Sequence, residues 1–168
     1  MEPPSSGPGR SMGSAGQIEV VIAEPRWRAA VGRPEQVARE AVAAALAEAE
    51  AQGYPVAGHV TVLLAGDREV RRLNGDFRAK YKPTNVLSFP AGMPGQLGDV
   101  ALAFGTVRRE ARAAKRTVRA HLAHLVAHGA LHRAGHDHLR AGEARRMEQA
   151  ESRALRRLAL PNPWRGLA

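Results

Sequence analysis

Six of the seven histidines in this chain of 168 residues fall between His121 and His138. Three of them follow the spacing H-x3-H-x5-H, as His128, His132 and His138. On a helix, residues four apart lie on one face, so His128 and His132 form an adjacent imidazole pair. His124 lies roughly 12 Å from His132 at 1.5 Å of rise per residue, too far to share one ion with it. The helix therefore supplies two ligands, and a third must come from beyond it.

Gly135 can bring a third ligand back toward the helix. A glycine just past the last helical turn readily adopts a left-handed conformation and reverses the chain direction. The segment His136, Asp137 and His138 would then approach the last turn of the helix. Three imidazole ligands leave a fourth position open for water, which is the arrangement of catalytic zinc sites. The histidine spacing is consistent with such a site.

A buried helix must position these histidines, and four strands with four further helices are predicted around it. From Ala120 to His132 there is no charged side chain unless a histidine is protonated, which is typical of a helix buried on most sides. Alternating or β-branched runs predict strands at Ile18–Ala23, His59–Ala65, Val86–Phe89 and Asp99–Phe104. Apolar residues at helical spacing predict helices at Pro34–Gln52, after a capping Asp67, at Thr106–Arg116 and at Ala141–Leu158. We therefore expect an α+β (α/β) domain, a small mixed four-stranded sheet packed around the histidine helix with about five helices in all.

The positive charge of the chain is concentrated in its histidine-containing part. Residues 1–105 carry 11 basic and 11 acidic side chains, whereas residues 106–168 carry 14 basic and 5 acidic ones, the whole net charge of +9. A positive field around a metal site suits a polyanionic substrate such as RNA or DNA. The alternative explanation is that an Arg-rich and Ala-rich composition reflects a GC-rich genome.

Composition also bounds the compartment and the domain organisation. The chain has no cysteine, which excludes disulfides and thiolate metal sites. It has neither an apolar run near the roughly 20 residues of a membrane span nor the apolar segment of a secretory signal, so we expect a cytoplasmic protein without a membrane partner. Small, polar, Pro and Gly residues predict that residues 1–16 are a disordered extension. Residues 17–160 are expected to form a single domain, followed by a short tail at residues 161–168.

Three sequence blocks resemble a known family. HGALHRAGHDH, at residues 128–138, resembles the HGxLHLxGYDH signature of the YbeY family, bacterial single-strand-specific endoribonucleases that act in ribosomal RNA maturation. LNGDFRAKYKPTNVLSFP, at residues 73–90, is similar to the family's LNxxYRxKDKPTNVLSFP, and LGDVAL, at residues 97–102, to its LGDIVI segment. The blocks occur in the family's order, and the resemblance covers most of the chain from Ile18 to Leu158.

The resemblance implies a zincin-like fold and a metal-dependent endoribonuclease domain. It implies that Zn²⁺ is held by His128, His132 and His138, although nickel or another divalent ion also accepts three imidazoles. Arg78 matches the basic residue that the family requires for RNA cleavage. The substrate implied is single-stranded ribosomal RNA, in late 16S maturation and ribosome quality control, with the small ribosomal subunit as partner.

The sequence departs from the family pattern at three positions, none of which removes a ligand or Arg78. They are Tyr81, where Asp is usual, Arg133, where Leu is usual, and His136, where Tyr is common.

Four further residues have predicted roles at the site. Lys80 and Lys82 would hold the RNA backbone beside Arg78 as point charges. His124 is expected to hydrogen-bond near the ligands without binding the metal itself. Asp137 either orients an imidazole or forms the turn. These four complete the predicted site.

Two other functions remain open on the sequence. A zinc metallopeptidase of the HExxH type carries a glutamate as general base where this chain has Gly129, so a peptidase would need a base from elsewhere, such as Asp137 or Glu110. A non-catalytic ribosomal RNA-binding assembly factor would use the metal only to stabilise its fold. For a nuclease, the attacking group is either a water activated by the metal or the 2′-hydroxyl of RNA.

Overall fold

The computed structural model describes residues 17–78, 85–90, 96–136 and 141–164, which form a four-stranded sheet and six helices. The predicted α+β class with a mixed sheet is confirmed. None of the helices in these ranges is long and apolar enough to cross a membrane. Several predicted features lie outside the described residues: the N-terminal extension 1–16, Lys80, Lys82, Asp137, His138 and the last four residues of the tail.

The sheet is mixed, with strand order β1-β2-β4-β3. Its strands are β1 (Ile18–Ile22), β2 (His59–Ala65), β3 (Val86–Pro90) and β4 (Gln96–Ala103). Strands β1, β2 and β4 run parallel, and β3 pairs antiparallel with β4 at one edge. Parallel strands require crossover connections, which helices provide here. The predicted strand positions agree with these bounds to within three residues.

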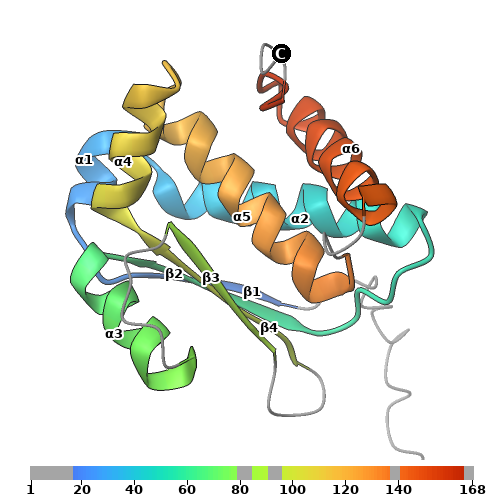
Figure 1. Ribbon diagram of the computed structural model, residues 1–168, viewed down its shortest axis with the longest axis horizontal. Coiled ribbons are helices and arrows are strands. Elements are labelled where there is room, and N and C mark those ends of the chain that lie inside the picture. The colour runs from blue at the N-terminus through green and yellow to red at the C-terminus, as the bar shows by residue number, and fades with distance from the viewer. Residues whose placement is uncertain (1–16, 79–84, 91–95, 137–140, 165–168) are drawn as a thin grey trace, which may run out of the picture.

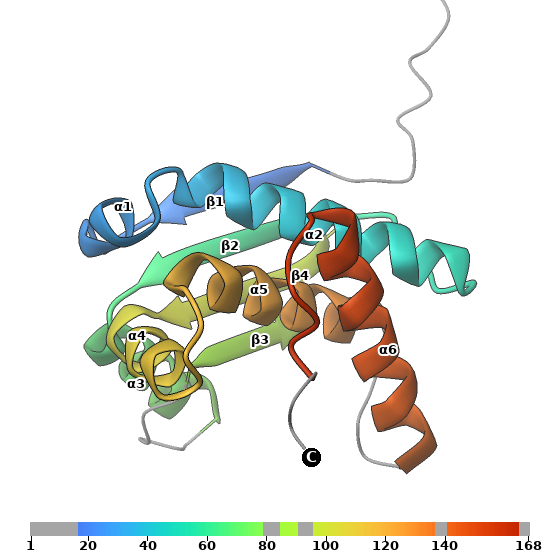
Figure 2. The same cartoon turned by 90° about the horizontal axis from the view of Figure 1, so that it is seen from above.

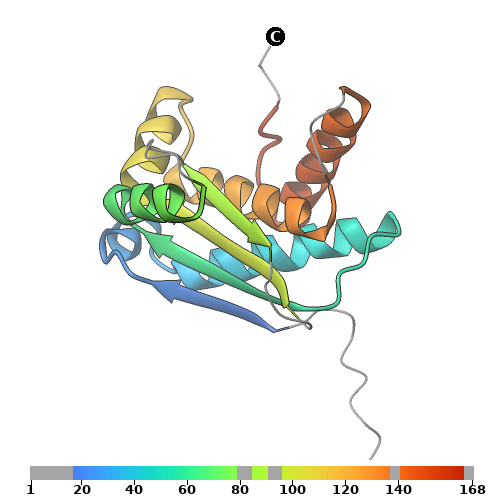
Figure 3. The same ribbon diagram turned by 60° about the horizontal axis from the view of Figure 1, so that its bottom comes forward.

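The two faces of the sheet are covered by different helices. On β2, Val60, Val62 and Leu64 belong to the main core, whereas Ala65 belongs to a smaller cluster on the opposite face, as the period of two requires. Helices α2 (Pro34–Ala51) and α5 (Val118–Ala134) lie over the main core, and α3 (Asp67–Arg78) lies on the other side of the sheet (Figures 1 and 3).

Helix α5 lies at the centre of the molecule. It contacts α2, α4 (Phe104–Ala113), α6 (Ala141–Arg157), β3 and β4, and Figure 2 shows it lying over the strands of the sheet. Thr117 caps it by accepting a hydrogen bond from the Ala120 amide at 3.0 Å. Eleven of its residues are buried, so the predicted burial of the histidine helix is confirmed.

The structure contains one helix that the sequence patterns do not predict, so the expected count of about five helices is one too low. Helix α1 (Arg26–Val31) has only six residues, too few to show an apolar repeat. It is held by Trp27, which is fully buried, packs edge-on against Phe104 and donates its indole N–H to the carbonyl of Ala65.

Gly129 lets α5 approach the sheet closely. A Cβ atom at this position would lie 2.8 Å from Cγ1 and 3.0 Å from Cγ2 of Val100 on β4. Val100 is fully buried, and its branched side chain has little rotamer freedom to move aside. Any side chain at position 129 would therefore push the helix off the sheet.

Asp67 joins the start of α3 to the start of α4. Its carboxylate accepts hydrogen bonds from the Thr106 amide at 2.9 Å and from Arg109 at 3.1 Å. Helix α3 begins at Asp67 as predicted, but the side chain caps α4, whose preceding residue Ala103 has no capping group. This long-range cap explains why α4 begins at Phe104, two residues before the predicted start at Thr106.

Helix α6 is fixed to α2 by a buried carboxylate. Glu48 of α2 accepts hydrogen bonds from Arg153 at 3.0 Å and from Arg157 at 2.8 Å. Burial alone would raise the pKa of Glu48, but the two arginines lower it below its ordinary value. The pair of arginines therefore sets the position of α6 over α2.

We expect Gly129→Ala to lower the free energy of unfolding by about 1 kcal/mol. An alanine inside a helix normally stabilises it by about 1 kcal/mol, but overpacking a rigid core costs about 1–3 kcal/mol. Urea unfolding followed by circular dichroism measures the difference.

Two variants test that explanation. Gly142→Ala, on α6 with no atom within 4 Å of the added Cβ, is the matched control and should be neutral or stabilising. In a Val100→Ala background, Gly129→Ala should lose its penalty. An unchanged penalty there would contradict the contact with Val100.

Asp67→Asn should weaken the protein at neutral pH and not in acid. Burial would raise the pKa of Asp67, but the bonds from Thr106 and Arg109 win and lower it, so the charged form stabilises the fold. This contribution is present above the unfolded pKa of about 4 and is lost as the pH falls through the lower folded value. Urea unfolding at a series of pH values should show the two proteins converging below about pH 4, with exposed Asp99→Asn as control. A constant difference at every pH would refute this.

Candidate metal centre

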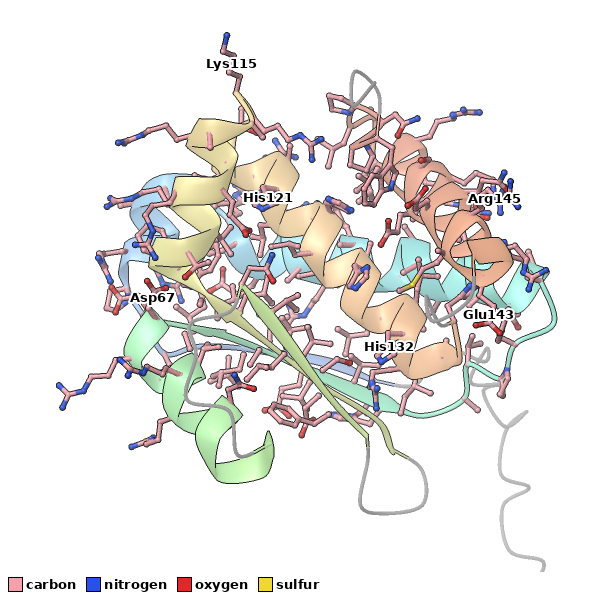
Figure 4. The ribbon with its side chains drawn as sticks, in the orientation of Figure 1. Asp67, Lys115, His121, His132, Glu143 and Arg145 are labelled. Carbon is pink, nitrogen blue, oxygen red and sulfur yellow. The ribbon has the colours of Figure 1, made fainter. Side chains whose placement is uncertain are left out.

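Four histidines form an imidazole row on α5: His121, His124, His128 and His132, with His121 and His132 at its two ends (Figure 4). His121 and His124 are buried, whereas His128 and His132 are partly exposed. A single residue of α6, Glu151, hydrogen-bonds both of the middle histidines of the row. The two middle histidines of the row are thus held by α6.

Glu151 is a buried carboxylate that receives three N–H groups. It is 1% exposed and is bonded by His128 Nδ1 at 2.5 Å, His124 Nε2 at 3.4 Å and the indole Nε1 of Trp164 at 2.9 Å. Burial alone would raise the pKa of Glu151, but the bonds from His124 and His128 lower it to about 2. The carboxylate is therefore ionised at neutral pH and acts only as an acceptor.

His128 and His132 have the same tautomer. An ionised carboxylate cannot donate, so His128 Nδ1 must carry the proton that it shares with Glu151. His132 Nδ1 donates in the same way to the backbone carbonyl of His136 at 3.0 Å. When such a ring binds a metal ion, it does so through the lone pair on Nε2, the nitrogen opposite the one that donates. The two residues fit a divalent ion that prefers imidazole nitrogen.

The predicted glycine bend is present at the end of α5. Gly135 has φ 124°, in the region that favours glycine, and its amide bonds the carbonyl of His132 at 3.2 Å. A Cβ atom there would also meet the ring of Tyr54 at 3.0 Å. The bend brings the carbonyl of His136 onto His132 and so helps to fix that ring.

His136 does not join the pair. Its side chain is 2% exposed and stacks on Tyr54 with ring centroids 4.2 Å apart. Burial lowers its pKa, so the ring is neutral. Within residues 17–78, 85–90, 96–136 and 141–164, no three His, Asp or Glu side chains gather into a metal-binding group. The predicted third ligand, His138, lies outside these ranges.

The remaining predicted site residues fall partly beyond the described side chains. Arg78 is the last residue of α3, and its side chain is outside the described residues, as are Lys80, Lys82 and Asp137. His124 contacts Glu151, which also contacts His128, so it is linked to the ligand pair through one carboxylate. Its predicted role beside the ligands stays a prediction.

Glu151 itself is the site residue that the sequence analysis misses. It lies on the buried face of α6, beside Met147, Ala150 and Ala154, which are all in the core. An acid within an apolar row at helical spacing is unusual, because a buried charge must be paired. That placement is the signal by which Glu151 is recognisable in the sequence.

Part of the excess positive charge lies on helices α4 and α6, which flank α5 in Figures 1 and 3. Lys115 and Arg145 mark these two regions in Figure 4. The exposed arginines of the two helices are Arg108, Arg109, Arg112, Arg145, Arg146, Arg156 and Arg157. An anionic chain reaching the histidine pair would therefore pass between two cationic surfaces.

Known proteins resemble this chain over most of its length. The family model described as Endoribonuclease YbeY matches residues 25–159. The endoribonuclease YbeY of Gluconobacter oxydans (strain 621H) is 48% identical over 165 residues, covering 98% of this chain and 93% of the relative. That of Chelativorans sp. (strain BNC1) is 42% identical over 164 residues, covering 93% and 98%.

A solved structure agrees with the fold. The solution structure of a Thermotoga maritima protein superposes with a TM-score of 0.54 at 23% identity, covering 85% of this chain and 92% of the other. The family model and the relatives together establish what kind of enzyme this is. The chain belongs to the YbeY family of endoribonucleases, and it is therefore a nuclease, a hydrolase of phosphodiester bonds in RNA.

Proposed function

We propose that this chain is a zinc-dependent endoribonuclease that cuts single-stranded RNA, with His128, His132 and His138 as the metal ligands. One observation supports the metal most directly: the Nδ1 atoms of His128 and His132 both donate to fixed acceptors, a carboxylate and a backbone carbonyl. Such acceptors select the tautomer that binds a metal through Nε2. The glycine bend at Gly135 starts the segment that contains His138.

The chain's own residues bind and orient the substrate in this proposal. Zinc supplies a Lewis acid at the phosphoryl group when it is bound. The guanidinium of Arg78 holds a phosphate in two-pronged fashion, and Lys80 and Lys82 hold its neighbours as point charges. Glu151 keeps the His128 ring in one orientation through its 2.5 Å bond.

The peptidase alternative is less well supported. Position 129 faces Val100 of the sheet, where a Cβ atom would already be too close, so the glutamate of an HExxH motif has no room there. Glu110, a possible substitute base, is engaged by Asn85 at 2.9 Å and by His121 at 3.0 Å. This argument does not bear on the other alternative, a non-catalytic RNA-binding assembly factor. The cleavage experiment below tests that alternative.

The charge distribution and the family support a proposal for the biological setting. We propose that residues 17–160 form one catalytic domain that acts in the cytoplasm on ribosomal RNA of the small subunit, in late 16S maturation and quality control. The exposed arginines of α4 and α6 support a long polyanionic partner, since each contact with a phosphate adds to binding.

Loss of the proposed metal ligand His132 or of Arg78, the proposed phosphate-binding residue, should abolish RNA cleavage. We expect zinc-loaded wild type to cut a single-stranded RNA, and His132→Ala and Arg78→Ala to lower the rate by roughly 100-fold or more, as for other groups that stabilise transition-state charge. The assay follows a labelled RNA on a denaturing gel, with all proteins purified in parallel so that a contaminating ribonuclease appears in every lane.

His59→Ala is the matched control for that experiment, because His59 is a histidine of β2 outside the α5 row, 3.6 Å from Glu19. It should cut at the wild-type rate. Wild type that binds RNA tightly without cutting it would instead favour the non-catalytic assembly factor.

Glu151→Gln should weaken zinc binding by roughly 10- to 100-fold, as expected when the partner of a ligating histidine is altered. The amide has the same shape but no charge, so His128 loses its ionised acceptor. Competition against a chelator of known affinity measures the effect without any enzymatic readout. Glu148→Gln, on the same helix, is the control and should bind zinc like wild type. Equal affinities of all three proteins would disprove the role of Glu151.

A further inference from the structure

A groove of about 600 Å³ begins at His128 and follows α5 toward the end of α4. The described residues that line it come from the start of β3, from α4 and the turn after it, which includes Arg116, from α5 and from Trp164 near the C-terminus. The surface of the groove is mostly apolar, and Val86 and Leu125 contribute to it. His128, the proposed metal ligand at one end, is polar. One end of the groove adjoins His128, a proposed metal ligand. A nucleotide bound in the groove would therefore lie next to the phosphate that is cleaved.

Trp164 gives this groove an aromatic wall that is held in place. Its indole Nε1 donates to Glu151 at 2.9 Å, and its backbone amide donates to the side chain of Asn162 at 2.9 Å. The ring meets His124 edge-on, with centroids 5.5 Å apart and an interplanar angle of 85°. Yet the residue is 37% exposed. A fixed and exposed indole is a surface on which a nucleobase can stack.

Glu110 gives the same groove a hydrogen-bond acceptor. Its carboxylate is held by the Asn85 amide at 2.9 Å and by His121 Nε2 at 3.0 Å, and its side chain remains 41% exposed. Burial lowers the pKa of His121, so this ring is a neutral donor that leaves the negative charge of Glu110 in place. The groove is therefore lined by an oriented carboxylate as well as by an aromatic wall.

We propose that this groove, resting on the endoribonuclease function above, binds one unpaired guanine next to the cleaved phosphodiester, stacked on Trp164 and read by Glu110. A carboxylate accepts hydrogen bonds and donates none. Guanine is the base that places two donors, N1–H and the N2 amino group, side by side on its Watson–Crick edge. Uracil has a single N3–H between two carbonyl oxygens, which the carboxylate repels.

This binding mode also gives a physical reason for cutting single strands. In a duplex, the N1–H and amino group of guanine already bond to cytosine and its ring faces are stacked on neighbours. Only an unpaired base can offer both its face to Trp164 and its edge to Glu110. The neighbouring phosphates then face the arginines of α4 and α6.

Intrinsic fluorescence tests the groove without any need for catalysis. The chain has two tryptophans, and Trp27 is fully buried with its indole bonded to Ala65, so quenching by an added nucleotide reports on Trp164. Guanosine 5′-monophosphate should quench the full-length protein at concentrations roughly tenfold lower than uridine 5′-monophosphate, the discrimination expected for a paired hydrogen-bond contact. Equal quenching by both nucleotides would overturn the proposal.

Two variants complete the test. Glu110→Gln keeps an oxygen for Asn85 and His121 but loses the charge, and it should reduce the preference for guanine to within about twofold. Trp164→Ala should weaken binding of a five-residue single-stranded RNA by roughly tenfold, as loss of one stacked base predicts. Glu69→Gln, on α3 and outside the groove, is the control and should behave as wild type.

Mapping of cut sites separates this inference from the proposed function. In a randomised single-stranded RNA, wild type should show guanine enriched at one fixed position beside the cut, and Glu110→Gln should still cut but lose that enrichment. Cleavage with the same enrichment in both proteins would overturn the guanine site and leave the endoribonuclease intact. Absence of cleavage together with a guanine preference in fluorescence would refute the cleavage proposal and support the groove.

Discussion

The carboxylate of Glu151 is the interaction on which the candidate site depends. A charge that is 99% removed from solvent must be matched by donors, and three N–H groups from different parts of the chain converge on it. Two come from α5 and one from Trp164 near the C-terminus. The requirement to satisfy one buried charge thus sets the ring orientation of His128, holds His124 and anchors the indole at the same time.

The position of that carboxylate depends in turn on how α6 is held. On one side of α6, Arg153 and Arg157 reach Glu48 of α2, and on the other side Glu151 reaches α5. Helix α2 packs against α5 as well, so the three helices form a closed set of contacts. Because each helix touches the other two, the distance between Glu151 and the imidazole row is set by the packing of the whole layer.

Local patterns in the sequence predict the strands, the buried helix and the glycine bend, since each depends on residues near one another in the chain. Alternation in His59–Ala65 and the uncharged run of α5 are such patterns. What local patterns do not contain is a partner far along the chain. Asp67 bonds Thr106 across 39 positions, and Glu151 bonds His128 across 23, so neither contact has a local signature. Helix α1 is missed for the opposite reason, because six residues are too few for a repeat.

The histidine pair and the centre of the hydrophobic core share one helix. Gly129, between His128 and His132 in sequence, packs against Val100, and Leu131 beside His132 is fully buried. Amide hydrogen exchange is slowest where opening requires global unfolding, and the middle of α5 has the burial expected of such a region. Fluctuations that would separate His128 from His132 must therefore melt the interior, so the spacing of the two imidazoles lasts as long as the molecule stays folded.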